Sequence, residues 1–315
     1  MVLENHYYSQ GKLLLSGEYF VLDGALALAL PTRMGQRLKV SYQTSEKKVL
    51  HWKSYDSNGQ LWFEAIFDGE NFDCLEKYAE QKSLVLEKIL KVAKKLAVNF
   101  LKDKESVLVE TYLEFPRLWG LGTSSTLINS VAKWAGINPY ELLAKTFGGS
   151  GYDVACADSD GPIFYEKHAD GPLATTAEFD PPFKNNLYFV YLGQKQSSAD
   201  GISYYKTLQK ITRKKEKLAQ KISKISKKLI KVRILGDFED LLATHEQIIA
   251  ESLNLPKVKD LFFADFWGQV KSLGAWGGDF VLVTSNQSEE ETKQYFLDKG
   301  YEVFIPYTEM IKTRD

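Results

Sequence analysis

A glycine-rich segment in the first half of the chain most constrains the fold. It reads Pro116-Arg117-Leu118-Trp119-Gly120-Leu121-Gly122-Thr123-Ser124-Ser125-Thr126 and passes directly into a stretch at 124–135 with helical apolar spacing. Glycines let the backbone curl so that several N–H groups converge, and the helix N-terminus adds its positive dipole end. The hydroxyls could bind phosphate or a metal ion, or simply cap the helix. Glycine on both sides of Leu121 favours an anion-binding loop over a plain cap by Ser124 or Ser125.

Two familiar nucleotide-binding patterns do not fit this segment. No lysine follows the second glycine, as the GxxxxGK[ST] loop of P-loop NTPases requires. The third glycine of the dinucleotide fingerprint is absent, and no acidic ribose ligand is placed after it. The segment therefore predicts a different kind of phosphate-binding loop.

Three further segments carry candidate chemistry. Lys12 starts an apolar strand and could present its ammonium to anionic oxygens, or it could extend to solvent. Gly274-Ala275-Trp276-Gly277-Gly278-Asp279 precedes an apolar strand at 280–284, which allows close approach of a ligand or forms a tight turn. Asp153 follows the loop at 148–151 and could accept a proton from a substrate hydroxyl or cap a short helix.

Composition excludes several classes of protein. The 40 Lys and Arg against 41 Asp and Glu give a net charge of −1, which argues against a globally basic nucleic-acid binder. The two cysteines and four scattered histidines form neither a disulfide framework nor a zinc signature, so we expect a cytoplasmic location. The start of the chain lacks the basic region of a signal peptide, and Glu18 and Asp23 interrupt the apolar stretch at 13–30. We therefore expect no membrane association.

The order of patterned segments favours an α+β fold with two domains, 1–180 and 181–315. The turn Asn58-Gly59 predicts a hairpin within 49–67, and the prolines at 171–183 suggest a linker. The other expected strands lie at 12–15, 25–30, 38–42, 106–114, 163–165, 187–192, 280–284 and 302–305. Helices are expected at 75–96, 124–135, 139–147, from 153, and at 202–232, 238–252, 258–273 and 290–299.

Taken together, the glycine-rich segments resemble the three motifs of the GHMP kinases, the superfamily of galactokinase, homoserine kinase, mevalonate kinase and phosphomevalonate kinase. Residues 11–24 look like motif one, 116–125 resemble the PxxxGLGSS of motif two, and 274–279 resemble GAGGGD of motif three. The mevalonate-pathway branch is most similar, because Gly17-Glu18-Tyr19-Phe20-Val21-Leu22 resembles GEYAVL and Gly149-Ser150-Gly151-Tyr152-Asp153-Val154-Ala155 resembles GSGFDVA. Residues 193–198 resemble a G-x-x-x-S-S turn near the substrate.

The resemblance implies a ribosomal protein S5 domain 2-like N-terminal domain and a ferredoxin-like C-terminal domain. It implies an ATP- and Mg²⁺-dependent transfer of phosphate to mevalonate or phosphomevalonate, a step of isoprenoid biosynthesis. Lys12 and Asp153 would be catalytic, and Ser124 and Glu141 would ligate Mg²⁺. The phosphates of ATP would contact Gly120, Leu121, Gly122, Thr123, Ser124, Ser125, Gly274, Gly277 and Gly278. The substrate would contact Glu18, Tyr19, Lys195 and Ser197, with Arg33 and Arg117 as further candidates for its carboxylate.

The sequence departs from the family pattern at four places. Gln10 stands where a proline is usual, and Trp119 and Trp276 are bulky where the family has small residues. Glu141 is the nearest match to the magnesium-binding glutamate, but its spacing from Asp153 differs by about one residue. Family members are often homodimers, so a homodimer is an expectation.

A basic segment at 206–233 supports an alternative function, a nucleic-acid-binding protein on a kinase-like fold. Its lysines cluster around a single glutamate, Glu216, and its apolar residues recur at helical spacing, which predicts an amphipathic helix with a basic outer face. We interpret this face as solvated and expect no nucleic acid partner. A sugar or homoserine remains the alternative acceptor to a small acidic substrate.

Overall fold

The computed structural model describes residues 3–43, 47–76, 80–102, 106–193, 198–208, 215–274 and 279–314. Strands and helices are mixed, and nearly all strand pairs are antiparallel, so the predicted α+β class is confirmed. Within the described ranges, no helix has the length and apolar character needed to cross a membrane. The chain divides into two compact units.

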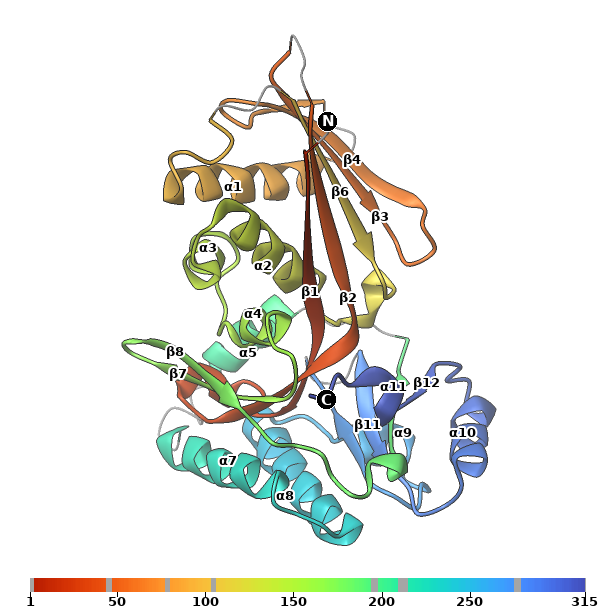
Figure 1. The fold of residues 1–315 in the computed structure, drawn as a ribbon. Helices are drawn as coiled ribbons and strands as arrows, with labels where there is room; N and C mark the ends of the chain where they lie inside the picture. Colours follow the sequence, from red (N-terminus) through yellow and green to blue (C-terminus); the bar gives the residue numbers. More distant parts are fainter. Residues whose placement is uncertain are drawn as a thin grey trace. The chain divides into compact units, whose positions relative to one another are not determined.

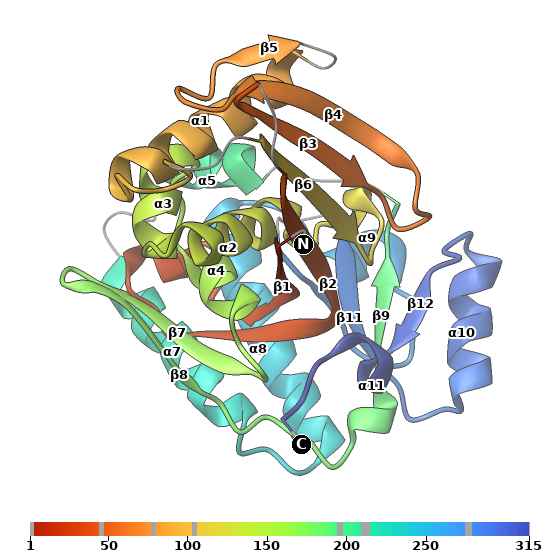
Figure 2. The ribbon, with the colours of Figure 1, turned by 45° about the horizontal axis from the view of Figure 1, so that its top comes forward.

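Unit 1 comprises 1–11, 34–117 and 121–158 and is built on a sheet. Its strand order is β5-β4-β3-β6-β2, with β1 also paired to β2, and the β3–β6 pair is parallel. Helices α1, α2 and α3 lie against one another on one face of this sheet (Figure 1, Figure 2). The elements are β1 (Leu3–Ser16), β2 (Ala27–Gln43), β3 (Val49–Tyr55), β4 (Leu61–Asp68), β5 (Cys74–Glu76), α1 (Glu80–Leu96), β6 (Ser106–Leu113), α2 (Thr123–Ala135), α3 (Pro139–Thr146) and α4 (Tyr152–Ala157). Both β1 and β2 continue into unit 2.

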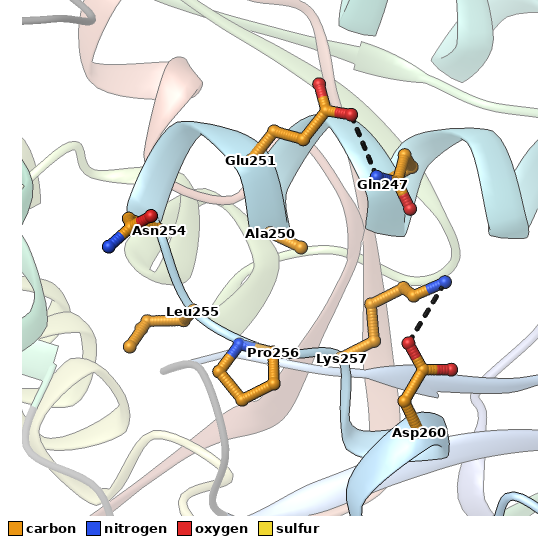
Figure 3. A pocket seen from close by; sticks show the side chains of 8 residues that line it. All are labelled: Gln247, Ala250, Glu251, Asn254, Leu255, Pro256, Lys257 and Asp260. Carbon is orange, nitrogen blue, oxygen red and sulfur yellow. Dashed lines mark hydrogen bonds and ion pairs between the residues drawn. The ribbon is translucent and has the colours of Figure 1, made fainter.

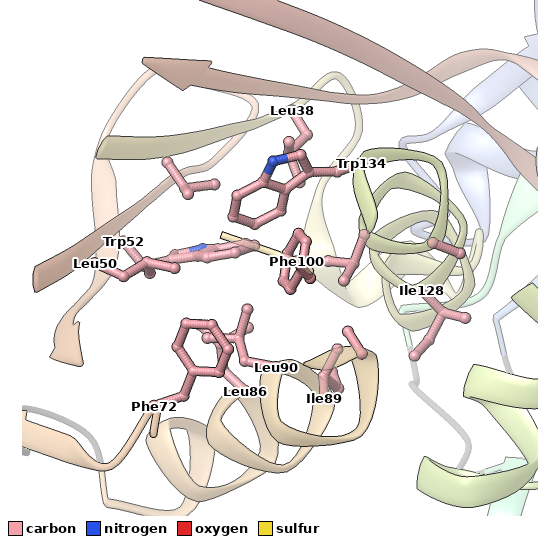
Figure 4. Close-up of a cluster of buried hydrophobic side chains, with 14 of the residues drawn as sticks. Leu38, Leu50, Trp52, Phe72, Leu86, Ile89, Leu90, Phe100, Ile128 and Trp134 are labelled. Atoms are coloured by element: carbon pink, nitrogen blue, oxygen red, sulfur yellow. The ribbon is translucent and has the colours of Figure 1, made fainter. Parts of the chain in front are cut away.

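The core of unit 1 forms because its strands and helices each bury one face. Burial alternates along β3 and β6, so Leu50 and Trp52 point inward while their neighbours are more exposed. Leu86, Ile89 and Leu90 follow helical spacing on α1 and pack into the same cluster (Figure 4).

Unit 2 comprises 12–33, 118–120 and 159–315 and contains a four-stranded antiparallel sheet. Its strand order is β10-β11-β9-β12, with β11 and β9 in register from Phe280 opposite Tyr191 to Thr284 opposite Leu187. The first residues of β2 pair with β7, and β7 pairs with β8. The strands are β7 (Ile163–His168), β8 (Gly171–Thr176), β9 (Leu187–Tyr191), β10 (Val270–Ser272), β11 (Phe280–Thr284) and β12 (Phe304–Pro306).

Helices of unit 2 cover a second apolar cluster beside the motif-one turn. Helices α7 and α8 lie side by side (Figure 1), and their residues Ile222 and Ile249 pack with Phe20 of the short 3₁₀ helix η1 (Phe20–Asp23). The α-helices described in unit 2 are α5 (Ser198–Thr207), α7 (Lys215–Leu229), α8 (Leu235–Leu253), α9 (Val258–Phe262), α10 (Glu289–Asp298) and α11 (Tyr307–Met310). Two further 3₁₀ helices are described in the chain, η2 (Arg117–Trp119) and η3 (Lys184–Asn186).

Several sequence predictions are confirmed by these elements. The hairpin at Asn58-Gly59 joins β3 to β4, and Gly59 has the positive φ of 76° that such a turn uses. Helices α2, α3, α8 and α10 lie within about one turn of the positions expected from apolar spacing. The helix expected at 75–96 ends at Leu96 as predicted but begins only at Glu80, because Cys74–Glu76 form the strand β5.

Three predictions are wrong. The expected linker at 171–183 contains the strand β8, which pairs with β7; proline is tolerated there because β8 is an edge strand. The helix expected at 258–273 ends at Phe262, and Val270–Ser272 forms a strand that pairs with β11. The helix expected at 202–232 is described as the separate helices α5 and α7, with 209–214 outside the described residues.

The two compact units have other bounds than the predicted domains 1–180 and 181–315, and that division into domains stays a prediction. Residues 12–33, 118–120 and 159–180 belong to unit 2, in which Ala27–Ala29 of β2 pair with β7. The assignment of the two domains to particular superfolds stays a prediction.

Candidate active site

The glycine-rich loop enters helix α2 through a glycine. Gly122 is the N-cap residue, with φ 94° and ψ 42°, and as a glycine it supplies no side-chain cap. Ser125 follows within the helix and donates its hydroxyl to the Gly122 carbonyl oxygen at 2.9 Å, so the N-cap position belongs to a glycine and not to a serine. Ser124 is exposed at the first turn. The arrangement fits an anion near the helix N-terminus better than a plain serine cap.

Buried hydrogen bonds fix the first turn of α2 to the sheet of unit 1. Thr126 donates its hydroxyl to the side-chain oxygen of Gln36 on β2 at 2.8 Å, and both residues are buried. Further along α2, Ser130 and Asn129 bond to Ser9 on β1 at 2.8 and 3.1 Å. The position of the exposed Ser124 hydroxyl is therefore set by a rigid helix.

Within unit 2, the structure brings together residues of all three glycine-rich segments. The Lys12 ammonium donates to the carbonyl oxygen of Gly120 at 2.9 Å. Gly120 has a φ of 67°, and a Cβ built on it would lie 2.3 Å from the carboxyl carbon of Asp279. Gly120 is therefore required by both its backbone conformation and the close approach of Asp279. Sequence reasoning named Gly120 and Lys12 but missed Asp279, although the last letter of the GAGGGD pattern was the available signal.

The bulky Trp119 has a packing role beside this contact. Its ring meets Phe280 of β11 edge-on at 5.4 Å and Tyr191 of β9 at 6.3 Å. The Tyr191 hydroxyl donates to the carbonyl oxygen of Leu118 at 3.0 Å. These contacts attach the loop segment 118–120 to the four-stranded sheet, which accounts for an aromatic residue at this position.

Asp153 lies in the first turn of α4, in unit 1. Gly151 precedes the helix with a φ of 93°, and the Asp153 carboxylate accepts from the N–H of Val154 at 3.1 Å. Burial raises the pKa of the Tyr140 hydroxyl, and the charges of Asp158 and Asp153 raise it further, so these side chains share one local electrostatic environment. The predicted catalytic groups belong to different units, Lys12 to unit 2 and Asp153 to unit 1.

The residues predicted for magnesium are exposed oxygen donors. Ser124 is exposed on α2, and Glu141 is exposed in the first turn of α3. Among the described residues, no group of three or more His, Cys, Asp or Glu side chains is arranged to hold a metal ion. The role of both residues stays a prediction.

Glu18, predicted to bind substrate, lies inside unit 2. Its carboxylate forms an ion pair with Lys271 of β10 and lies 3.2 Å from Nε2 of His245 on α8. Burial raises the pKa of Glu18 and lowers that of His245, so the histidine is neutral at pH 7. Burial also raises the pKa of neighbouring Glu246 to about 8. Sequence reasoning missed Lys271, His245 and Glu246, because the partners of these residues are distant in the sequence.

Tyr19, also predicted to bind substrate, adopts an unusual backbone conformation. Its φ is 60°, and its ring stacks on Tyr205 of α5 at 5.5 Å. Its neighbour Tyr205 donates its hydroxyl to Asp23, which also pairs with Lys215 at 3.2 Å. These contacts connect α5 and α7 to the motif-one turn. Substrate binding by Glu18 and Tyr19 stays a prediction.

Several predicted residues lie outside the described residues, namely Lys195, Ser197, Trp276, Gly277 and Gly278. Gly274 is described and has a φ of 74°. Arg33 donates to the carbonyl oxygen of Thr308 at 2.8 Å, and the guanidinium of Arg117 lies 4.2 Å from the centre of the Trp62 ring. Both arginines have structural contacts in their own units.

A surface hollow at the end of α8 contains none of the predicted site residues. Figure 3 shows it between the last turn of α8 and the start of α9, with Gln247 bonded to Glu251 and Lys257 paired with Asp260. Glu251 and Asp260 at its rim are exposed and Lys257 is half-buried, and each of the three has a partner within the hollow. We assign no function to it.

The basic face of α7 is as the sequence predicted. The buried side of the helix carries Ala219, Ile222 and Ile225, and the opposite side is exposed. The exposed basic residues here and just beyond are Lys217, Lys221, Lys224, Lys227, Lys228, Lys231 and Arg233. This pattern is that of a solvated amphipathic helix packed on a core.

At the level of sequence, no family model and no curated protein matches the chain. Among solved structures, the chain is similar to Methanococcus jannaschii mevalonate kinase, with a TM-score of 0.70 and 14% identity over 100% of this chain and 98% of that one. It is similar to Lactococcus lactis galactokinase complexed with galactose, with a TM-score of 0.69 and 13% identity over 98% and 93%. It is also similar to Streptococcus pneumoniae phosphomevalonate kinase in complex with phosphomevalonate and AMPPNP, with a TM-score of 0.67 and 14% identity over 96% and 99%.

These likenesses extend over nearly the whole of each chain. The chain therefore has the fold of the GHMP kinases, and the resemblance inferred from its three glycine-rich segments is confirmed at the level of the fold.

Proposed function

We propose that the protein is an ATP-dependent small-molecule kinase that transfers the γ-phosphoryl group to a hydroxyl of mevalonate or phosphomevalonate. The observation that carries the proposal is the meeting of Lys12, Gly120 and Asp279, one from each glycine-rich segment, within unit 2. A fold shared with kinases does not itself specify an activity, whereas this side-chain arrangement supports one.

Phosphoryl transfer depends mainly on positioning and on stabilising charge. In the proposed reaction, the acceptor oxygen bonds to the γ-phosphorus, the bond from that phosphorus to the bridging oxygen breaks, and ADP leaves. The backbone N–H groups at the start of α2 hold phosphate oxygens, with Gly122 leaving the helix N-terminus without a side-chain cap. Lys12 stabilises the negative charge that develops on the transferred group.

Asp153 receives or orients the proton of the acceptor hydroxyl. A carboxylate in this role contributes about 10²–10⁴-fold in rate. Ser124 and Glu141 would hold Mg²⁺, and the ion would supply neutralisation of the charge on the nucleotide phosphates. Both residues are exposed oxygen donors in unit 1, which suits an ion that retains several waters.

A GHMP-type kinase for a sugar or for homoserine is the second candidate. The similarity to galactokinase has a TM-score of 0.69, beside 0.70 for mevalonate kinase, so overall shape does not separate these acceptors. The exposed lysines of α7 would serve a third, nucleic-acid-binding function; steep salt dependence of RNA binding would support it. A cytoplasmic location and a homodimer remain part of the proposal.

A coupled ADP-release assay tests the proposal. The purified protein is incubated with ATP, Mg²⁺ and one acceptor at a time: mevalonate, phosphomevalonate, galactose or homoserine. ADP release that depends on mevalonate or phosphomevalonate supports the first candidate. Release only with galactose or homoserine favours the second, and failure to bind ATP refutes both.

A further inference from the structure

A cluster of four buried ionisable side chains in unit 2 carries out no step of the proposed phosphoryl transfer. Glu18 is 3% exposed, and Lys271, His245 and Glu246 are fully buried. Moving charged groups out of water costs several kcal/mol each, and replacing a buried ion pair with apolar residues is often neutral or stabilising. Stabilisation of the fold therefore does not by itself explain why four ionisable side chains are buried together at this place.

The cluster connects three elements that flank the candidate site. Glu18 comes from the motif-one turn, Lys271 from β10, and His245 and Glu246 from α8. It also holds the backbone, because the N–H of Gly17 donates to His245 Nε2 at 3.1 Å and the N–H of Ser272 donates to Glu246 at 3.2 Å. The motif-one turn and β10 are thus fixed to the same helix.

From β10, a continuous series of contacts leads to Lys12. The N–H of Leu273 donates to the carbonyl oxygen of Phe280 at 3.0 Å, which places Asp279 beside the end of β10. The Asp279 carboxylate packs against Gly120, and the Gly120 carbonyl oxygen accepts from Lys12.

Strand β1 closes the series, because it carries Lys12 and ends at Ser16, next to the turn that contains Glu18. The Lys271–Glu18 ion pair is therefore one link in a closed ring of contacts within unit 2.

We propose that Lys271 is a positioning residue for the Lys12 ammonium: its ion pair with Glu18 holds the motif-one turn against β10, and this keeps Lys12 on the Gly120 carbonyl. Lys271 has no exposed surface, so it acts through Glu18 and not by touching a substrate. The catalytic consequence rests on the proposed kinase function. The geometric consequence, the placement of Lys12, does not.

Three variants separate positioning from stability. Lys271→Met removes the ammonium and keeps a side chain of similar length, but it leaves Glu18 buried without its ion-pair partner. The double variant Glu18→Gln, Lys271→Met removes both charges, so its thermal stability should return toward that of the wild type. Lys271 also donates to the carbonyl oxygen of Ser272 at 2.8 Å. Lys259→Met is therefore the matched control, since this lysine of α9 likewise donates to a backbone carbonyl, that of Gly268 at 2.6 Å, but lies outside the ring.

Two readouts are measured on the full chain. The first is the rate at which an amine-reactive acylating reagent labels Lys12, followed by mass spectrometry; it requires no enzymatic activity. The second is kcat and the KM for ATP in the ADP-release assay. Displacing a catalytic group by about 1 Å can reduce turnover by about 10²-fold.

We expect faster Lys12 labelling and a loss of kcat approaching 10²-fold in the double variant despite its recovered stability, with Lys259→Met unchanged in both. The inference is overturned if the double variant labels Lys12 at the wild-type rate, or if its kcat returns together with its melting temperature. Should the wild-type protein transfer phosphate to no acceptor, the proposed function fails, and the labelling rates still decide whether Lys271 positions Lys12.

Discussion

Replacing Glu246 with glutamine should stabilise the protein, and by more as the pH rises. Burial raises the pKa of this carboxyl from 4.5 to about 8, although Lys271, 3.8 Å away, acts in the opposite direction. Between pH 4.5 and about pH 8, the Glu246 carboxyl keeps its proton in the folded protein and loses it in the unfolded chain. The wild type therefore loses stability as pH rises from 4.5 and stops losing it above about 8. Glutamine cannot ionise, so the stability of the Glu246→Gln variant does not fall with pH in this way.

The linkage relation gives the magnitude. The expected gain for Glu246→Gln in the free energy of unfolding is about 1 kcal/mol at pH 5 and about 3 kcal/mol at pH 7, rising to about 5 kcal/mol at pH 9. Glutamine keeps the oxygen that accepts from Ser272 at 3.2 Å. Its amide replaces a carboxyl oxygen that is buried and has no hydrogen-bond partner among the described residues. The substitution therefore changes ionisation and leaves the shape of the side chain intact.

Urea unfolding at pH 5, 7 and 9, followed by circular dichroism, measures the gain. Glu251→Gln is the matched control, because Glu251 is exposed on the same helix; its stability should follow the wild type at every pH. A gain that stays constant across the three pH values, or a destabilised Glu246→Gln protein, would refute the reasoning about the buried cluster.

Three further substitutions test the candidate site. Gly120→Ala should cost about 1–3 kcal/mol in urea unfolding, since φ is 67° and the new Cβ would meet the Asp279 carboxyl at 2.3 Å; wild-type stability would contradict this contact. Asp153→Asn should reduce kcat by about 10²-fold or more with ATP binding and melting temperature near wild type, and an active variant would remove Asp153 from the mechanism. Ser124→Ala should raise the Mg²⁺ concentration needed for half-maximal turnover, and unchanged Mg²⁺ dependence would exclude Ser124 as a ligand.

Much of the fold could be predicted because turns and amphipathic helices are specified by residues that are close together in the sequence. The Asn58-Gly59 turn and the apolar spacing of α1 and α2 each report their own element. Strand β8 was missed because Pro172 suggests a linker, whereas at a sheet edge its lack of an N–H is harmless. Strand β10 was missed because a three-residue strand has too short a pattern to recognise.

The candidate site was predictable only where glycine marks it. Gly120 and Gly122 stand out in the sequence because left-handed backbone conformations favour glycine. Asp279 and Lys271 do not stand out in this way, because their roles depend on residues more than 150 positions away that only the folded chain brings close. Long-range pairs of this kind leave no local signature in a single sequence.

The ADP-release assay with mevalonate and with phosphomevalonate, run in parallel on the wild type and on Asp153→Asn, tests whether the protein is a mevalonate-type kinase. We predict acceptor-dependent ADP release by the wild type with one of the two acceptors and a loss of about 10²-fold or more in the variant. ADP release that is independent of every acceptor, or equal in the two proteins, would contradict the claim that this fold holds a mevalonate-type kinase site.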